Sequence, residues 1–159
     1  MPVVEREGRK VYEPAERRVL RMAAGRTITE TDIVTFANLF LTPSLQGKQN
    51  EAHAIQLITM IDGLGSGTYA SPEYKALVKE VRESLVGDMP ITGEGSLGWH
   101  NWKLYKPVRP GDTISIEIEL ERATASRSRP GMVIYEIKKT AYNQHGEKVI
   151  EVVHQLGNW

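Results

Sequence analysis

The chain has 159 residues, of which 40% are hydrophobic and 25% charged, a composition typical of one globular domain. Twenty basic and twenty acidic residues cancel, so no net charge favours nucleic acid or an anionic membrane as a partner. The absence of cysteine excludes disulfides, thiolate nucleophiles and cysteine-ligated metals. No apolar run has the length of a signal peptide or a membrane span, so we expect a cytoplasmic protein.

The N-terminal third begins with a charged segment. Residues 1–16 contain two prolines and many charges, which predicts a loose arm, and residues 17–28 predict one strand. Thr29 followed by Asp32 is typical of a helix start, because the hydroxyl caps the first turn and the acid suits the helix dipole. Apolar residues at positions 33, 36, 37 and 40 give this helix one buried stripe, and Pro43 ends it.

Two further helices are expected in the middle of the chain. The segment "AHAIQLITMIDGLGSG" places apolar residues on most faces of a helix, which predicts a buried helix. Its glycines, 63, 65 and 67, are expected to end it. Ser71 and Pro72 fit the N-cap and first turn of the next helix, whose narrower stripe (residues 74, 77, 78, 81 and 85) predicts a position at the surface.

From residue 88 onward the hydrophobic period changes to two. In "TISIEIELE", isoleucines 114, 116 and 118 and Leu120 face one way, and serine and glutamates face the other, as in a strand with one wet face. Residues 133–137 repeat the pattern, and "EKVIEVVHQLG" supplies a last strand. Turn residues at 109–112, 128–131 and 143–147 separate them. Helices followed by an antiparallel meander predict an α+β fold.

Three segments carry a resemblance to a known family. "TITETDIVTFANL" (27–39), "KLYKPVRPGDTI" (103–114) and "SRSRPGMVIYEIKKTAYNQHGEKV" (126–149) are similar to segments of MaoC-like acyl dehydratases and (R)-specific enoyl-CoA hydratases. The resemblance implies a hotdog fold for residues 1–159, in which a curved sheet wraps the central helix. It also implies an acyl-CoA or acyl-carrier thioester as substrate, no resident cofactor or metal, and paired subunits with sites at the dimer interface.

The usual catalytic motif of that family is not matched. The family has an Asp, then Asn-Pro, then His between the first helix and the central one. Counting along this chain, the Asp position falls near Thr42 and the His position near Gly47. Any acid–base pair must therefore come from other residues.

The start of the central helix offers the first candidates. His53 lies beside Asn50 and Glu51, and an imidazole can act as an acid or base near neutral pH. The helix N-terminus supplies N–H donors to a thioester carbonyl. We therefore expect His53 and Glu51 to be catalytic and Asn50 to bind substrate. The alternative is that both are ordinary polar residues of a first helical turn.

Asp62 is the second catalytic candidate, because a carboxylate in an otherwise apolar run is costly to bury without a partner. The spacing of His53 and Asp62 resembles a pattern of hotdog thioesterases. One α-helix puts the two roughly 13 Å apart, so direct cooperation would need a second subunit. Alternatively, Asp62 is an exposed acid at a helix end. The histidines at 100, 145 and 154 are expected at the surface.

Two arginines in one turn, Arg127 and Arg129, match the phosphates of coenzyme A, and we expect them to bind substrate unless they form a solvated hairpin tip. Trp99 and Trp102 are expected in core or interface packing. The leading hypothesis is a homodimeric hydratase or dehydratase of 2-enoyl or 3-hydroxyacyl thioesters. The alternatives are a hotdog acyl-CoA thioesterase and a non-catalytic thioester-binding or partner subunit.

Overall fold

The structure, a computed structural model, describes residues 2–21, 25–40 and 50–159. Its strands form one eight-stranded sheet in the order β1-β2-β6-β7-β8-β5, with β3 and β4 also paired to β6. Every pairing is antiparallel. The strands are β1 (Val3–Arg6), β2 (Arg9–Tyr12), β3 (Val19–Arg21), β4 (Arg26–Thr27), β5 (Glu94–Leu104), β6 (Thr113–Ala125), β7 (Val133–Tyr142) and β8 (Lys148–Asn158).

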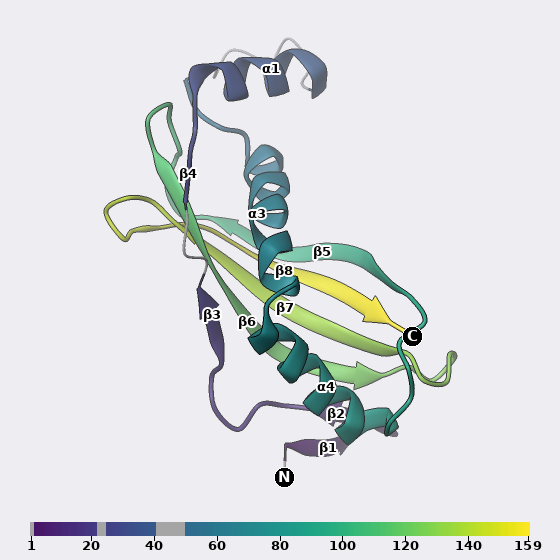
Figure 1. The fold of residues 1–159 in the computed structure, drawn as a ribbon. Coiled ribbons are helices and arrows are strands. Elements are labelled where there is room, and N and C mark those ends of the chain that lie inside the picture. Colours follow the sequence, from purple (N-terminus) through teal and green to yellow (C-terminus); the bar gives the residue numbers. More distant parts are fainter. Residues whose placement is uncertain (1, 22–24, 41–49) are drawn as a thin grey trace.

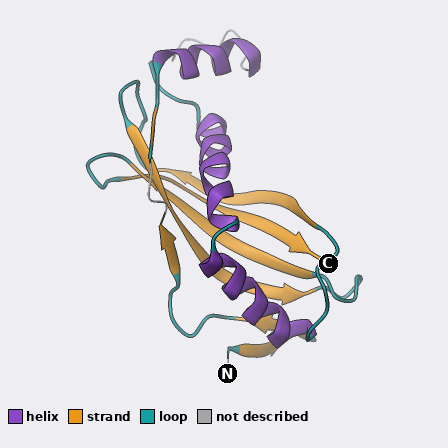
Figure 2. Ribbon diagram, in the orientation of Figure 1, coloured by secondary structure: helices purple, strands orange, loops and turns teal. Residues whose placement is uncertain are grey.

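The described helices are α1 (Glu30–Phe40), α3 (Ala54–Tyr69) and α4 (Pro72–Val86). Helices α3 and α4 follow one another along one face of the curved sheet, and α1 lies beyond the start of α3 (Figure 1). Figure 2 shows that the long strands run behind these two helices as a single layer. Among the described residues, no helix is long and apolar enough to cross a bilayer.

The alternation predicted for β6 is confirmed. Its isoleucines and Leu120 are at most 5% exposed and belong to the same core as Leu57 and Ile61 of α3. The opposite face carries ion pairs, among them Arg17–Glu119 at 2.7 Å and Arg21–Glu117 at 2.7 Å. One face therefore packs on the helices and the other is charged.

The expected end of α3 at its glycines is wrong, because the helix continues to Tyr69. A side chain at Gly65 would meet Ile118 Cδ1 at 3.3 Å and Lys139 Nζ at 3.4 Å. Here glycine lets the helix backbone approach the sheet closely, which outweighs its low helix propensity. Gly63 faces open space and has no such role.

The loose arm predicted for residues 1–16 is also wrong. Residues 3–12 form the β1–β2 hairpin, and Val11 and Tyr12 pair with Thr124 and Ala123 of β6. The Tyr12 side chain is 1% exposed and its hydroxyl donates to Glu80 at 2.5 Å. Burial of this ring and pairing to β6 hold the segment. The single strand expected over 17–28 is divided between β3 and β4, and residues 22–24 lie outside the described residues.

The predicted helix starts are confirmed. The Thr29 amide donates to Asp32 at 2.9 Å, and the Asp32 amide donates to the Thr29 hydroxyl at 3.1 Å. Ser71 caps α4 by accepting from the Tyr74 amide. The stripe of α1 is only partly buried, since Phe40 is 70% exposed. Pro43, expected to end α1, lies outside the described residues.

Candidate functional site

His53 occupies the N-cap of α3 with an extended backbone (φ −68°, ψ 146°), and its side chain accepts from the Ile55 amide. The acceptor atom is Nδ1, at 3.2 Å. Because a backbone N–H can only donate, a neutral His53 carries its proton on Nε2. The ring also stacks on Phe36 of α1, with 6.4 Å between centroids. His53 is thus a fixed, half-buried imidazole whose second nitrogen is a hydrogen-bond donor.

The residues before His53 are held by the segment that precedes β6. Glu51 pairs with Arg109 at 3.0 Å, and the Ala52 amide donates to the Val108 carbonyl at 2.8 Å. Asn50 is exposed beside them. The structure therefore brings the three candidates Asn50, Glu51 and His53 to one place. The family positions near Thr42 and Gly47 lie outside the described residues.

Asp62 has different partners, which the sequence did not predict. Its Oδ1 lies 2.5 Å from the Lys139 ammonium and 3.3 Å from His154 Nδ1. Lys139 is fully buried, whereas the Asp62 side chain is 36% exposed. Burial lowers the pKa of Lys139, and the hydrogen bond to Asp62 opposes that shift. Asp62 is therefore the counter-ion of a buried cation and does not touch His53 within one chain.

The surface position expected for His154 is wrong. The residue is 2% exposed, its Nε2 lies 2.8 Å from the Ser96 hydroxyl, and its ring stacks on Trp99 with 4.8 Å between centroids. Burial, and then the nearby Lys139 charge, lower the pKa of His154 from 6.5 to about 4. The imidazole is therefore neutral at neutral pH.

A sequence signal for this cluster was present. Lys139 continues the inward positions of β7 after Tyr135 and Ile137, and His154 pairs with Ile137 across β7 and β8. A polar residue at an inward position of a strand needs a partner. Asp62, the one acid in the apolar part of α3, was that partner.

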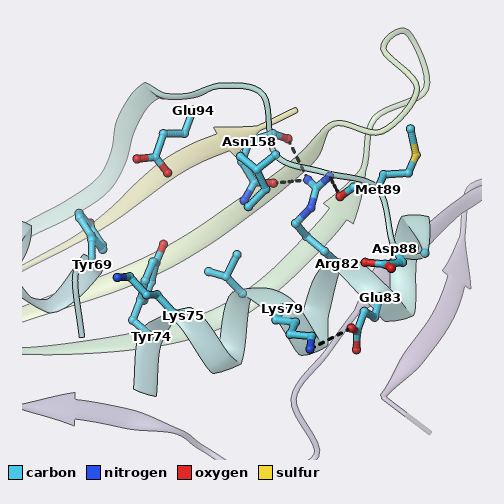
Figure 3. Close-up of a pocket in the computed structure, with 13 residues that line it drawn as sticks. Tyr69, Tyr74, Lys75, Lys79, Arg82, Glu83, Asp88, Met89, Glu94 and Asn158 are labelled. Atoms are coloured by element: carbon cyan, nitrogen blue, oxygen red, sulfur yellow. Dashed lines mark hydrogen bonds and ion pairs between the residues drawn. The ribbon is translucent and has the colours of Figure 1, made fainter. Parts of the chain in front are cut away.

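A pocket of about 370 Å³ lies between α4 and the segment before β5. Tyr69, Tyr74 and Glu94 line it, and Arg82 anchors its wall by donating to Asn158 Oδ1 at 2.6 Å and to the Met89 carbonyl at 3.1 Å (Figure 3). Burial raises the pKa of both tyrosines. The Tyr69 hydroxyl also lies 3.5 Å from His154 Nδ1, which connects the pocket to the buried cluster.

Arg127 and Arg129 lie far from the start of α3. They follow the C-terminal end of β6, whereas Val108 and Arg109, which contact the α3 start, precede its N-terminal end. A strand of 13 residues spans roughly 40 Å. Arg129 lies over the Trp159 ring at 4.4 Å. Within one chain, the arginine pair and His53 do not share a site.

The tryptophans of β5 are not core residues of the described chain. Trp99 is 45% exposed and Trp102 is 50% exposed. They lie on a strand that pairs only with β8, at the end of the sheet order. No group of three or more potential metal ligands (His, Asp or Glu) occurs in the described ranges 2–21, 25–40 and 50–159.

No family model and no curated protein matches the chain. Solved structures that are similar to the chain include three that cover about nine-tenths of it. One is a monoamine oxidase regulatory protein from Archaeoglobus fulgius, with TM-score 0.59 and 21% identity over 89% of this chain and 88% of that one. The second is a MaoC-like dehydratase from Rhodospirillum rubrum, with TM-score 0.55 and 20% identity over 92% and 93%.

The third is a complex of C-terminally truncated HadBC, a 3R-hydroxyacyl-ACP dehydratase from Mycobacterium tuberculosis, with TM-score 0.57 and 14% identity over 91% of this chain and 97% of that one. At these identities the likeness concerns the fold. An antiparallel sheet wrapped around a central helix, shared with MaoC-like and (R)-hydroxyacyl dehydratases over about nine-tenths of the chain, confirms the predicted α+β class. The chain has the hotdog fold.

Proposed function

We propose that the protein binds an acyl thioester at the N-terminus of α3 and interconverts 2-enoyl and 3-hydroxyacyl thioesters. The observation that carries this proposal is the fixed imidazole of His53, whose Nδ1 is occupied by the Ile55 amide. Its Nε2–H is then a side-chain donor at the helix start, where N–H groups favour a thioester carbonyl. The fold shared with a MaoC-like dehydratase supports the same reaction class.

In the dehydration direction, the Glu51 carboxylate takes the proton from C2 and passes it to the C3 hydroxyl, to which His53 Nε2–H donates a hydrogen bond, and the C3–O bond breaks as water leaves. Hydration reverses both transfers. Arg109 orients Glu51 through their ion pair, and the amide of Asn50, an exposed residue, binds the thioester end. The coenzyme A or carrier-protein arm belongs to the substrate, and no resident cofactor takes part.

The test is hydration of crotonyl-CoA, followed by the loss of enoyl absorbance. His53→Gln removes the positioned imidazole N–H that donates to the C3 oxygen and is expected to lower turnover by about 100-fold or more. His145→Gln, at an exposed turn, is the matched control and is expected to keep wild-type turnover. Hydration at the wild-type rate by His53→Gln would exclude His53. No turnover of crotonyl-CoA or of saturated acyl-CoAs by wild type would favour a non-catalytic binding subunit.

We also propose that the protein is a homodimer joined along β5. This strand is 11 residues long and lies at the end of the sheet order. Its exposed apolar side chains are Leu97, Trp99, Trp102 and Leu104. An open, apolar edge strand is a surface that soluble proteins normally cover, and a second copy of the same strand covers it symmetrically.

A further inference from the structure

Ser96, His154 and Asp62 lie in one line of contacts. Ser96 Oγ is 2.8 Å from His154 Nε2, and His154 Nδ1 is 3.3 Å from Asp62 Oδ1. A proton on Nδ1, the nitrogen nearer the carboxylate, leaves Nε2 free to accept from the serine hydroxyl. This is the order of groups that activates a serine nucleophile: hydroxyl, imidazole, carboxylate.

The central histidine is held in one orientation. It is buried, it stacks on Trp99, and both ring nitrogens have partners. Asp62 is fixed in turn by the Lys139 ammonium at 2.5 Å. Because His154 is neutral at neutral pH, it is present as the base. The Lys139 charge opposes the imidazolium that forms during turnover, and the Asp62 carboxylate, which contacts both groups, stabilises it.

Ser96 is open to a substrate. It is exposed on β5, next to a bulge in which Leu97 has no partner residue on β8. Glu94, two residues earlier, faces the same side of the strand and lines the 370 Å³ pocket. Tyr69 lines the same pocket and touches His154. Ser96 and His154 do not line the pocket themselves, but Glu94 and Tyr69 connect it to them, so we place the acyl chain in the pocket with its carbonyl end toward the serine.

We infer that Ser96 is the nucleophile of a second activity, acyl transfer from a thioester to serine followed by hydrolysis. Ser96 Oγ attacks the thioester carbonyl carbon, its proton passes to His154 Nε2, and the C–S bond breaks as that proton goes to the leaving sulfur. Water then attacks the serine ester, giving its proton to His154, and the ester C–O bond breaks as Ser96 regains a proton. The products are a free acid and a thiol. This inference shares only the substrate class with the proposed function, since neither His53 nor Glu51 takes part.

The direct test is covalent labelling of the full-length protein with a fluorophosphonate probe, with the adduct located by peptide mass spectrometry. Wild type is expected to carry one adduct, on Ser96, and Ser96→Ala none. Ser66→Ala is the matched control: Ser66 is an exposed serine whose hydroxyl donates only to a backbone carbonyl of its own helix, at 2.7 Å. It is expected to label like wild type.

The second readout is thiol release from saturated acyl-CoAs. Ser96→Ala and His154→Gln are each expected to lower the rate by at least about 100-fold. Asp62→Asn, which keeps the size of the side chain and an oxygen acceptor for Lys139, provides a second test if His154→Gln fails to fold, and it is expected to slow labelling.

An adduct absent from Ser96, or formed equally fast in a folded His154→Gln or Asp62→Asn variant, would overturn the inference and leave a buried polar cluster with a structural role. Crotonyl-CoA hydration is measured separately and depends on His53, so failure of either proposal leaves the other standing.

Discussion

Acid sensitivity of the fold is expected to come from His154. Its pKa is lowered from 6.5 to about 4 by burial and by Lys139, so the unfolded chain binds the proton more tightly than the folded one. The free energy of unfolding must therefore fall as the pH decreases from 6.5 toward 4. The charged and titratable groups that face His154 are Asp62 and Tyr69 from α3 and Lys139 from β7.

The magnitude follows from the width of this window. Each pKa unit corresponds to about 1.4 kcal/mol, so lowering the pH from 6.5 to 5 costs about 2 kcal/mol, and the whole window about 3 kcal/mol. Carboxylates with lowered pKa values, such as Asp32 and Glu80, contribute stability that is lost only below their ordinary values of 3.8 and 4.5. Between pH 5 and 6.5, the change in the free energy of unfolding is therefore expected to come from His154 and not from these carboxylates.

The assay is urea unfolding followed by tryptophan fluorescence at pH 7 and pH 5, at one protein concentration because association shifts apparent stability. Wild type and His145→Gln, which changes an exposed histidine, are expected to lose about 2 kcal/mol. His154→Gln has no group to protonate there and is expected to lose little. An equal loss in His154→Gln and wild type would refute this account of the buried imidazole.

Two further predictions concern α3 and β5. Gly63→Ala, where an added side chain faces open space, is expected to raise the free energy of unfolding by about 0.5–1 kcal/mol. Gly65→Val, whose Cβ would lie 3.3 Å from Ile118, should lower it by about 1–3 kcal/mol in urea unfolding, and equal effects at both positions would contradict the close-packing role. Light scattering at micromolar concentration is expected to give a dimer for wild type and for Leu39→Lys, on α1, and a monomer for Trp102→Lys, on β5. A monodisperse wild-type monomer would rule out the assembly.

Local chemistry made much of the fold predictable. The capping of α1 by Thr29 and of α4 by Ser71, and the inward isoleucines of β6, each depend on interactions within a few residues or on a strict period of two. Such signals survive in any fold that uses the element, which is why these predictions were confirmed.

Features that depend on distant parts of the chain were missed. The helix continues through Gly65 because this position packs against Ile118, more than fifty residues later in the chain. The N-terminal hairpin is held because Val11 and Tyr12 pair with the edge of β6. The contacts of Asp62 with Lys139 and His154 join three elements. The candidates at the start of α3 lie together because they are neighbours in sequence. Arg127 and Arg129 are separated from them by the full length of β6, which the sequence pattern does not convert into a distance from the α3 start.

If copies join through β5 as proposed, the N-terminal hairpin limits how many copies one sheet can join. Three short strands, β4, β3 and β2, cover successive parts of the outer edge of β6. The last strand on that side, β1, has only four residues, of which Val4, Glu5 and Arg6 are exposed. Of the described strands, only β5 offers a long apolar edge. In the proposed dimer, pairing of β5 with itself across a two-fold axis leaves only the two short β1 edges free. Such an assembly closes, whereas a sheet with two long apolar edges would continue into a filament.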